Sequence, residues 1–223
     1  MDILQRSRLF FKEEKLKTIA NSSILVAGVG ALGCVVAEIL VRLSVGRLVI
    51  VDRDVVSASD LGRQLLYNSN DLDKPKVEVA KERLSVIGSN TAIEPYFLDI
   101  TAGGMDDLLK SVDGVVDCLD NFASRFFLED LLPEKTFMVH GGIKYNFGQI
   151  TTIVKDKTQA LGDIYAGIED SSKPIGVAPT AVFVIGGLMA EETLNNIFGK
   201  PHFLNKLLIV DLGDFSCSVI NLE

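Results

Sequence analysis

The sequence has few residues of the kinds that bind zinc or form disulfides. Its 223 residues include three cysteines, Cys34, Cys118 and Cys217, and two histidines, His140 and His202. The cysteines are far apart and include no Cys-x-x-Cys pair, so we expect neither a disulfide framework nor a zinc site. We therefore predict that the three cysteines are small buried side chains.

Long apolar runs and an excess of positive charge are also lacking. The most apolar stretch, residues 178–190, is too short for a membrane span and is typical of a buried helix. The N-terminal residues carry charge where a signal peptide has an apolar core. The net charge of −8 disfavours broad binding to nucleic acid or anionic membranes. We expect a cytoplasmic protein with no nucleic-acid or membrane partner.

Hydrophobic residues make up 48% of the chain, which suits one domain with a substantial core. Short apolar runs alternate with longer helical patterns as far as residue 140. This alternation predicts an α/β fold with a Rossmann-like parallel sheet and helices on both faces. The expected strands are residues 24–27, 47–51, 92–96, 115–117 and 137–140, and the expected helices are residues 31–43, 75–86, 105–110 and 121–132.

The pattern changes beyond residue 140. Residues 148–154 alternate between polar and apolar, as in a half-exposed antiparallel strand. A polar crossing loop (155–178) and a long apolar helix (179–198) follow. Two closing strands are expected at 207–210 and 215–222, so the parallel sheet should continue into a mixed sheet with antiparallel closing strands.

We therefore expect one domain, residues 1–223, with three parts. Residues 1–22 form an N-terminal helical arm. Residues 23–140 form a nucleotide-binding half, and residues 141–223 form a half for acceptor binding and dimerisation.

A glycine loop lies between the first expected strand and the helix that follows it. Gly28, Gly30 and Gly33 allow a tight turn, and the backbone N–H groups around Ala31 and Leu32 can approach a phosphate at the positive end of the helix. Asp52 ends the next strand, where a carboxylate accepts hydrogen bonds from ribose hydroxyls. Alone, these features also fit an oxidoreductase or sensor that binds NAD(P).

Arg63, Lys76 and Asp120 favour a triphosphate instead. Arg63 offers a planar fork and Lys76 a compact charge. Each cation about 4 Å from a phosphate gains roughly 4 kcal/mol at an effective dielectric of about 20. Asp120 follows the fourth expected strand, at the edge where open α/β sheets bind ligands, and its carboxylate suits Mg2+. We expect ATP and Mg2+, with Asp120 as the metal ligand.

These segments resemble the ubiquitin-activating E1 superfamily, in its small prokaryotic branch of homodimers. That branch includes the adenylyltransferases for the molybdopterin and thiamine sulfur carriers. The matching segments follow the same order over most of the chain: residues 26–33, 51–64, 74–78, 117–125, 141–143 and 148–149.

The resemblance implies a role for each candidate residue. Asp52 should bind ribose, Arg63 and Lys76 should grip the phosphates, and Asp120 should position magnesium and be the residue most needed for adenylation. Arg8 should reach the ATP bound by the second subunit of a homodimer. The nucleotide site should further include Asp54, Gln64 and Asn121.

The chain also departs from the family pattern. It lacks the two Cys-x-x-Cys pairs that hold structural zinc, and residues 155–180 contain no cysteine for a thioester or persulfide. A cysteine-based second step is therefore not expected. Asp60 stands where the family usually has asparagine.

A carboxylate acceptor needs no general base, because its pKa near 4 leaves it ionised at neutral pH. It attacks the α-phosphorus of ATP, and pyrophosphate leaves. Two acceptors stay open: a small-molecule acid, and the C-terminal glycine of a ubiquitin-like sulfur carrier protein. Whether a downstream protein captures the adenylate also stays open.

The size and missing motifs resemble the E1-like protein that activates guanylylpyridinol for the Fe-hydrogenase cofactor of methanogens. We therefore expect the small acid first. His140 and Lys144 lie near the end of the fifth expected strand. We predict that His140 is a partly buried histidine with satisfied hydrogen bonds and that Lys144 belongs to a turn; a place in the lining of the acceptor site is the alternative for both.

Overall fold

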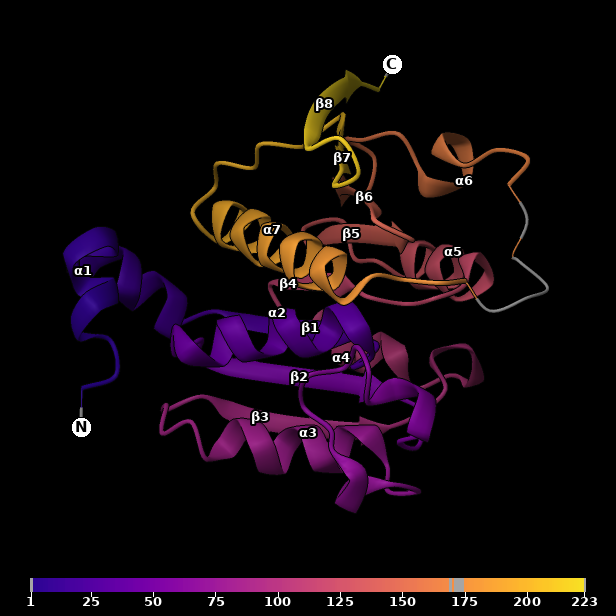
Figure 1. Ribbon diagram of the computed structural model, residues 1–223. Helices are drawn as coiled ribbons and strands as arrows, with labels where there is room; N and C mark the ends of the chain where they lie inside the picture. The colour runs from indigo at the N-terminus through magenta and orange to yellow at the C-terminus, as the bar shows by residue number, and fades with distance from the viewer. Residues whose placement is uncertain (1, 169, 171–174, 223) are drawn as a thin grey trace.

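Eight strands form one mixed sheet in the computed structural model, which describes residues 2–168, 170 and 175–222 (Figure 1). The strand order is β3-β2-β1-β4-β5-β6-β7-β8. The first five pair in parallel, and the pairs from β5 to β8 are antiparallel. The strands are β1 (Ser23–Ala27), β2 (Arg47–Asp52), β3 (Ala92–Phe97), β4 (Gly114–Asp117), β5 (Phe137–Lys144), β6 (Phe147–Val154), β7 (Lys206–Asp211) and β8 (Ser216–Asn221).

Helices cover both faces of the sheet because successive side chains of a strand point to opposite sides. Ile24 and Val26 of β1 belong to the core with α1, α2, α3 and α7. Leu25 and Ala27 belong to the core with α4, α5 and α6. The helices are α1 (Gln5–Ala20), α2 (Ala31–Arg42), α3 (Lys76–Ser85), α4 (Met105–Lys110), α5 (Phe122–Asp130), α6 (Leu161–Ile164) and α7 (Pro179–Ile197).

The predicted α/β architecture is confirmed, including the change from parallel to antiparallel strands. The expected N-terminal helix is α1, which is kinked at Lys12, where the backbone leaves helical geometry. The polar loop after β2 contains two short 3-10 turns, Ala58–Asp60 and Ser69–Asp71. The crossing loop contains the short helix α6.

Strand β5 is longer than predicted, because it continues through two glycines to Lys144. A Cβ on Gly141 would lie 2.2 Å from the sulfur of Met189, so the absent side chain lets α7 pack against the strand. The turn at Tyr145, with a φ of 58°, then leads into β6.

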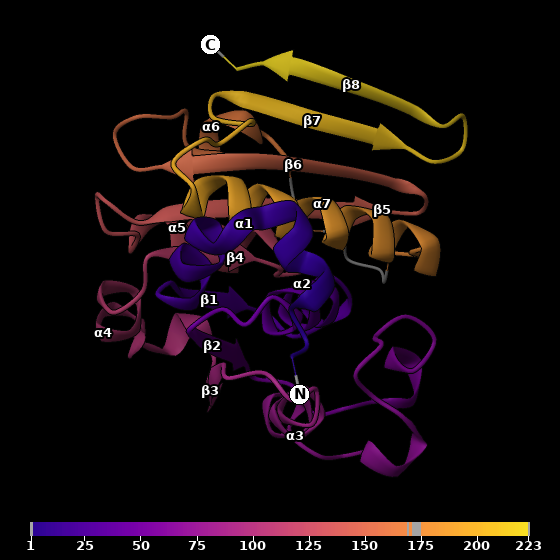
Figure 2. The ribbon, with the colours of Figure 1, turned by 90° about the vertical axis from the view of Figure 1, so that its left-hand side faces the viewer.

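The prediction for the cysteines is correct at two positions and wrong at the third. Cys34 and Cys118 are buried, whereas Cys217 is exposed. Cys217 lies on β8, the last strand of the sheet, and every residue of that strand is exposed (Figure 2). An alternating pattern predicts a strand but not whether a layer covers it.

The carboxyl ends of the central strands meet at one edge of the sheet. Ala27 at the end of β1 is in register with Val51 on one side and Asp117 on the other, and Asp117 is in register with His140. Side chains just beyond these positions therefore face a common space. None of the described helices is long and apolar enough to cross a membrane.

Candidate active site

The glycine loop between β1 and α2 is packed too tightly for side chains. Gly28 has a φ of +88°, and a Cβ there would lie 2.9 Å from the carbonyl oxygen of Cys118. A Cβ on Gly33 would lie 1.9 Å from the carbonyl oxygen of Gly28. The loop therefore lies directly against the segment after β4 and folds back onto the first turn of α2.

Asp52 and Tyr67 fix the backbone of this loop at Val29. Asp52 Oδ2 accepts a hydrogen bond from Val29 N–H at 2.7 Å, and Asp52 Oδ1 accepts one from Asp54 N–H at 2.8 Å. Burial raises the pKa of Asp52, although these hydrogen bonds and the charge of Lys76 oppose the rise. The Tyr67 hydroxyl donates to the carbonyl of Val29 at 2.7 Å.

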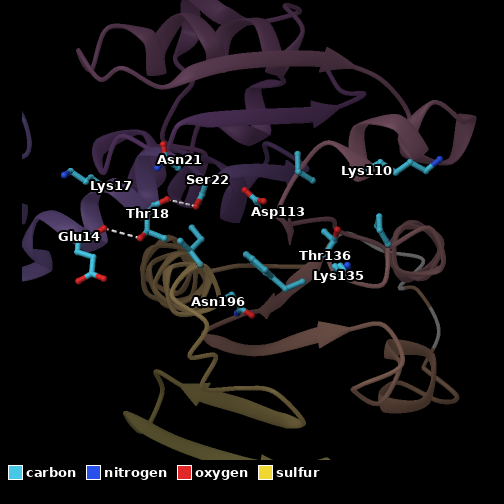
Figure 3. A pocket seen from close by; sticks show the side chains of 14 residues that line it. Glu14, Lys17, Thr18, Asn21, Ser22, Lys110, Asp113, Lys135, Thr136 and Asn196 are labelled. Atoms are coloured by element: carbon cyan, nitrogen blue, oxygen red, sulfur yellow. Dashed lines mark hydrogen bonds between the residues drawn. The ribbon is translucent and has the colours of Figure 1, made fainter.

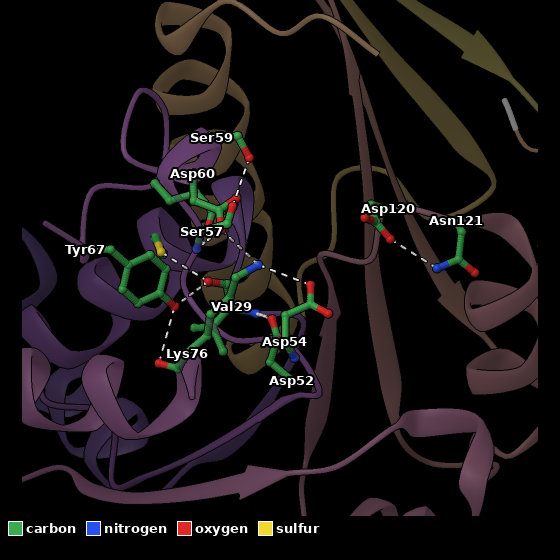
Figure 4. Close-up of polar contacts among 12 residues, drawn as sticks. Val29, Asp52, Asp54, Ser57, Ser59, Asp60, Tyr67, Lys76, Asp120 and Asn121 are labelled. Carbon is green, nitrogen blue, oxygen red and sulfur yellow. Dashed lines mark hydrogen bonds and ion pairs between the residues drawn. The ribbon is translucent and has the colours of Figure 1, made fainter. Parts of the chain in front are cut away.

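Lys76, at the start of α3, carries a buried positive charge beside the loop. Its Nζ lies 3.2 Å from Asp54 Oδ2 and 3.7 Å from Asp60 Oδ2 (Figure 4). Burial acts to lower the pKa of Lys76, but Asp52, Asp54 and Asp60 outweigh it and the pKa is raised. The ammonium therefore stays charged and is held in place by carboxylates.

Asp60 organises the two neighbouring candidates, Arg63 and Gln64. It is buried and accepts hydrogen bonds from Gln64 Nε2 at 2.7 Å and from Arg63 Nη2 at 3.4 Å. The Gln64 amide lies beside Gly30, 3.8 Å from where a Cβ on that glycine would be. The unusual Asp60 thus has a role: it holds the Gln64 amide beside the loop and pairs with the Arg63 guanidinium.

Gln64 leaves one hydrogen-bonding atom unused. Its Oε1 is buried and has no partner within the described part of the chain. The contact of Nε2 with the Asp60 carboxylate fixes which end of the amide is the donor, so the free atom is an acceptor. A buried acceptor without a partner, next to a glycine loop, fits a site that a polar ligand completes.

Asp120 lies on the other side of this space, just beyond β4. Its carboxylate is exposed, and Asn121 Nδ2 donates to Asp120 Oδ1 at 3.1 Å. Asn121 is also the N-cap of α5, because its Oδ1 accepts from Ser124 N–H at 2.9 Å. In Figure 4, Asp120 lies across from Asp52, Asp54 and Lys76.

Arg53 follows β2 and forms an ion pair with Asp99 at 2.7 Å. Its pKa is raised by hydrogen bonding to Asp99 and by the charges of Asp99, Asp54 and Asp120. Asp54 and Asp120 therefore act on the same guanidinium. At the carboxyl edge of the sheet lie the loop residues Gly28, Gly30, Ala31, Leu32 and Gly33 and the side chains Asp52, Asp54, Lys76, Asp120 and Asn121, and Asp60 joins Arg63 and Gln64 to Lys76.

Three other candidate residues do not belong to this group of side chains. Arg8 forms ion pairs with Asp2 and Glu13 of its own chain. Lys144 is exposed, with its ammonium 5.7 Å from the centroid of the Tyr145 ring. His140 is buried, as predicted, and its complete burial excludes the alternative that it lines an acceptor site.

A buried chain of polar side chains, which was not predicted from the sequence, lies behind this edge. His140 Nδ1 lies 2.6 Å from Asp117 Oδ2, and His140 Nε2 lies 3.0 Å from the hydroxyl of Tyr165. Polar residues at the ends of two apolar strands, Asp117 and His140, were the available signal. Nothing in the sequence pattern pointed to Tyr165.

A second hollow lies at the opposite edge of the sheet, where the strands begin (Figure 3). It has a volume of about 870 Å3, and its lining includes Ser22, Asp113 and Thr136, which precede β1, β4 and β5. Its lining includes no part of the glycine loop. We therefore place the candidate active site at the carboxyl edge.

The chain is similar in sequence to known adenylyltransferases. The model of the ThiF family matches residues 4–223. The sulfur carrier protein adenylyltransferase of Thermus thermophilus is 33% identical over 213 residues, covering 89% of this chain and 77% of that protein. The molybdopterin-synthase adenylyltransferase of Escherichia coli is 32% identical over 206 residues, covering 89% of this chain and 82% of that protein.

Solved structures show the same fold. The crystal structure of E. coli MccB with MccA-N7isoASN superimposes with a TM-score of 0.83 at 20% identity, covering 99% of this chain and 72% of that chain. Since the family model spans nearly the whole sequence, the chain belongs to the ThiF family and is an E1-like adenylyltransferase that uses ATP.

Proposed function

We propose that this enzyme adenylates the C-terminal carboxylate of a ubiquitin-like sulfur carrier protein. The observation that carries the acceptor class is the 33% identity to the T. thermophilus enzyme, whose name states that it adenylates a sulfur carrier. The alignment covers 89% of this chain and therefore includes both the nucleotide-binding half and the half assigned to the acceptor.

The expected small-molecule acceptor has less support. Neither of the curated relatives described above is named for the guanylylpyridinol precursor or for another small acid. The likeness to MccB, at 20% identity, concerns the fold alone. We therefore place the carrier protein first and the small acid second.

The site fits ATP in three respects. At Gly30 a Cβ would meet only Gln64 Nε2, at 3.8 Å, so the loop backbone there is open to phosphate oxygens, and its N–H groups lie at the N-terminus of α2. Lys76 and Arg63 supply two positive charges, which suit the outer phosphates. Asp52 and the free acceptor Oε1 of Gln64 remain for the hydroxyl and amino groups of the nucleoside.

Asp120 fits a magnesium ion carried by the triphosphate. Its exposed carboxylate has an oxygen free of contacts with Asn121. No group of three or more His, Cys, Asp or Glu side chains in the described parts of the chain is arranged to hold a metal. One carboxylate with phosphate and water oxygens is a donor set that Mg2+ accepts. When bound, the ion would neutralise charge on the phosphates.

The chemistry then needs alignment more than acid–base catalysis. The acceptor carboxylate oxygen forms a bond to the α-phosphorus, and the bond from that phosphorus to the α–β bridging oxygen breaks. The electron pair leaves with pyrophosphate, so the products are the acyl-adenylate and pyrophosphate. Lys76 and Arg63 stabilise the charge that develops on the leaving group, while the loop holds the α-phosphate in line.

Arg8 and the homodimer belong to the same proposal. In one chain Arg8 pairs with Glu13 and Asp2 at the exposed α1, so its guanidinium is not part of the site. We infer that the Arg8 guanidinium enters the ATP site of a second copy of the chain. Co-expression of an Arg8→Ala chain with an Asp120→Asn chain should restore part of the activity if the residue acts across subunits, whereas no restoration would contradict this role.

The acceptor is tested by ATP–pyrophosphate exchange with purified enzyme. We expect labelled pyrophosphate to enter ATP in the presence of a ubiquitin-like carrier from the same genome. The same carrier with an amidated C-terminus should be inactive. Exchange with small acids but with none of the carriers would replace this acceptor with a small molecule.

A further inference from the structure

The buried polar chain behind the active site connects two distant parts of the sequence. Asp117 ends β4, His140 lies within β5, and Tyr165 follows α6 in the connection between β6 and α7. Asp117 and His140 have no exposed surface, and Tyr165 is 5% exposed. None of these groups takes part in the mechanism above, so their burial calls for another explanation.

Only one assignment of donors and acceptors is possible for the hydrogen bonds that join Asp117, His140 and Tyr165. Burial acts to raise the pKa of Asp117, but Arg125 and His140 outweigh it, so this pKa is lowered and the group is a carboxylate. Burial lowers the pKa of His140 and raises the pKa of Tyr165, so both are neutral. His140 Nδ1–H therefore donates to Asp117, and the Tyr165 hydroxyl donates to His140 Nε2.

At one end of this series of hydrogen bonds, Asp117 fixes the segment that carries Asp120. Asp117 Oδ1 accepts a hydrogen bond from Leu119 N–H at 3.0 Å. Arg125, whose Nε lies 3.9 Å from Asp117 Oδ2, donates from the other side to the carbonyl of Leu119. Both backbone groups of the residue before Asp120 are thus fixed by one buried ion pair.

The Tyr165 end holds the connection between β6 and α7 against α5. The Tyr165 ring packs on Phe122, the first residue of α5, with centroids 5.2 Å apart. The same ring lies 5.4 Å from His140. Removing the hydroxyl would therefore leave the packing in place and break one link of the hydrogen-bond chain.

We propose that Tyr165, through His140 and Asp117, is a positioning residue that sets the place of Asp120 for adenylation. Buried hydrogen bonds that are all satisfied rigidify the groups they join. Outer groups of this kind orient the ligands of a bound ion even though they do not touch it. This inference rests on the proposed role of Asp120.

The test is Tyr165→Phe, with Tyr96→Phe on β3 as the matched control. We expect Tyr165→Phe to lower kcat for ATP–pyrophosphate exchange by about tenfold, with KM for ATP unchanged, as loss of an outer positioning group does. The Mg2+ concentration that gives half the maximal rate should rise. Tyr96→Phe should leave these values as in the parent enzyme.

A second readout does not depend on activity. Hydrogen exchange followed by mass spectrometry should show faster exchange in residues 118–122 of Tyr165→Phe, with α3 unchanged. His140→Phe, which breaks both hydrogen bonds, should give a larger increase in the same segment.

The outcomes separate the two proposals. If the parent enzyme shows no pyrophosphate exchange with any acid, the proposed function fails, and hydrogen exchange still decides whether this network holds residues 118–122. If Tyr165→Phe changes neither kcat nor the protection of that segment, the positioning role is wrong. Equal loss of protection over the whole chain would also overturn it, because it would show a role in general stability alone.

Discussion

Val29 N–H donates a hydrogen bond of 2.7 Å to Asp52 Oδ2, and this contact joins the glycine loop to the end of β2. The other carboxylate oxygen accepts from Asp54 N–H at 2.8 Å. One side chain thus sets the path of the loop and the position of Asp54, which in turn contacts Lys76. The phosphate-binding and cationic parts of the site are therefore one structure.

The first prediction concerns Asp52→Asn. Both oxygens accept backbone N–H groups, so the amide nitrogen of asparagine would face a donor and leave it without a partner, at a cost of about 1–3 kcal/mol. Urea denaturation should show this loss, and ATP affinity should fall with it. Asp156→Asn, at an exposed position with a φ of 60°, should be neutral; equal stability of the two variants would contradict the assignment.

Lys76→Met should weaken ATP binding by about 100-fold, since it removes a charge worth several kcal/mol to a nearby phosphate. It also leaves Asp54 and Asp60 facing the ligand without their cation. Calorimetry with a non-hydrolysable ATP analogue measures this change. Lys81→Met, on the exposed side of the same helix, serves as control; if both variants bind alike, Lys76 does not contact the phosphates.

The buried pair of Asp117 and His140 predicts that acid lowers stability. Burial lowers the pKa of His140 below its ordinary 6.5, while Arg125 and His140 hold the pKa of Asp117 below its ordinary 3.8 against the effect of burial. The unfolded chain therefore takes up these protons at a higher pH than the folded chain. The free energy of unfolding should be greatest above about pH 6.5 and fall as the pH decreases, first through His140 and then through Asp117.

His140→Gln isolates the first of these two steps. The variant should lose less stability than the parent between pH of about 7.5 and 5.5, measured by urea denaturation at each pH. His202→Gln is the control, because that side chain is exposed. Identical pH profiles for His140→Gln and the parent would show that His140 does not cause the acid sensitivity.

Glu192 lies away from the site, and we expect it to contribute to the stability of the fold. Its buried carboxylate accepts hydrogen bonds from Thr152, from the backbone N–H groups of His202 and Phe203, and from Asn195. Glu192→Ala should cost about 3 kcal/mol or more, because several buried donors lose their acceptor. Its exposed neighbour is the control: Glu191→Ala should change stability by less than about 0.5 kcal/mol. Similar values for the two would contradict this role.

Much of the site was predictable because it follows strand ends. Apolar runs located β1, β2 and β4, and parallel strands bring their carboxyl ends together, so Asp52 and Asp120 could be placed near the glycine loop without a structure. The contact of Lys76 with Asp54 depends on the path of the polar loop, which carries no periodic signal. The role of Asp60 could be assigned only from its contacts in the structure.

What was not predictable depends on contacts between distant segments. Tyr165 meets His140 across 25 residues of sequence, and the position of α6 decides that contact. The sequence pattern of β8 predicts a strand, but the burial of Cys217 depends on whether another layer covers that strand. Strand β5 extends through Gly141 because Met189 of α7 fills the space, which local preference does not reveal.

The proposed transfer of AMP from ATP to a carboxylate makes Asp120 essential. The most direct measurement is intact mass spectrometry of a carrier protein after incubation with ATP, Mg2+ and either the parent enzyme, Asp120→Asn or Asp130→Asn. We expect a carrier–AMP adduct with the parent and with Asp130→Asn, and a yield at least about 100-fold lower with Asp120→Asn. An undiminished adduct with Asp120→Asn would contradict this expectation.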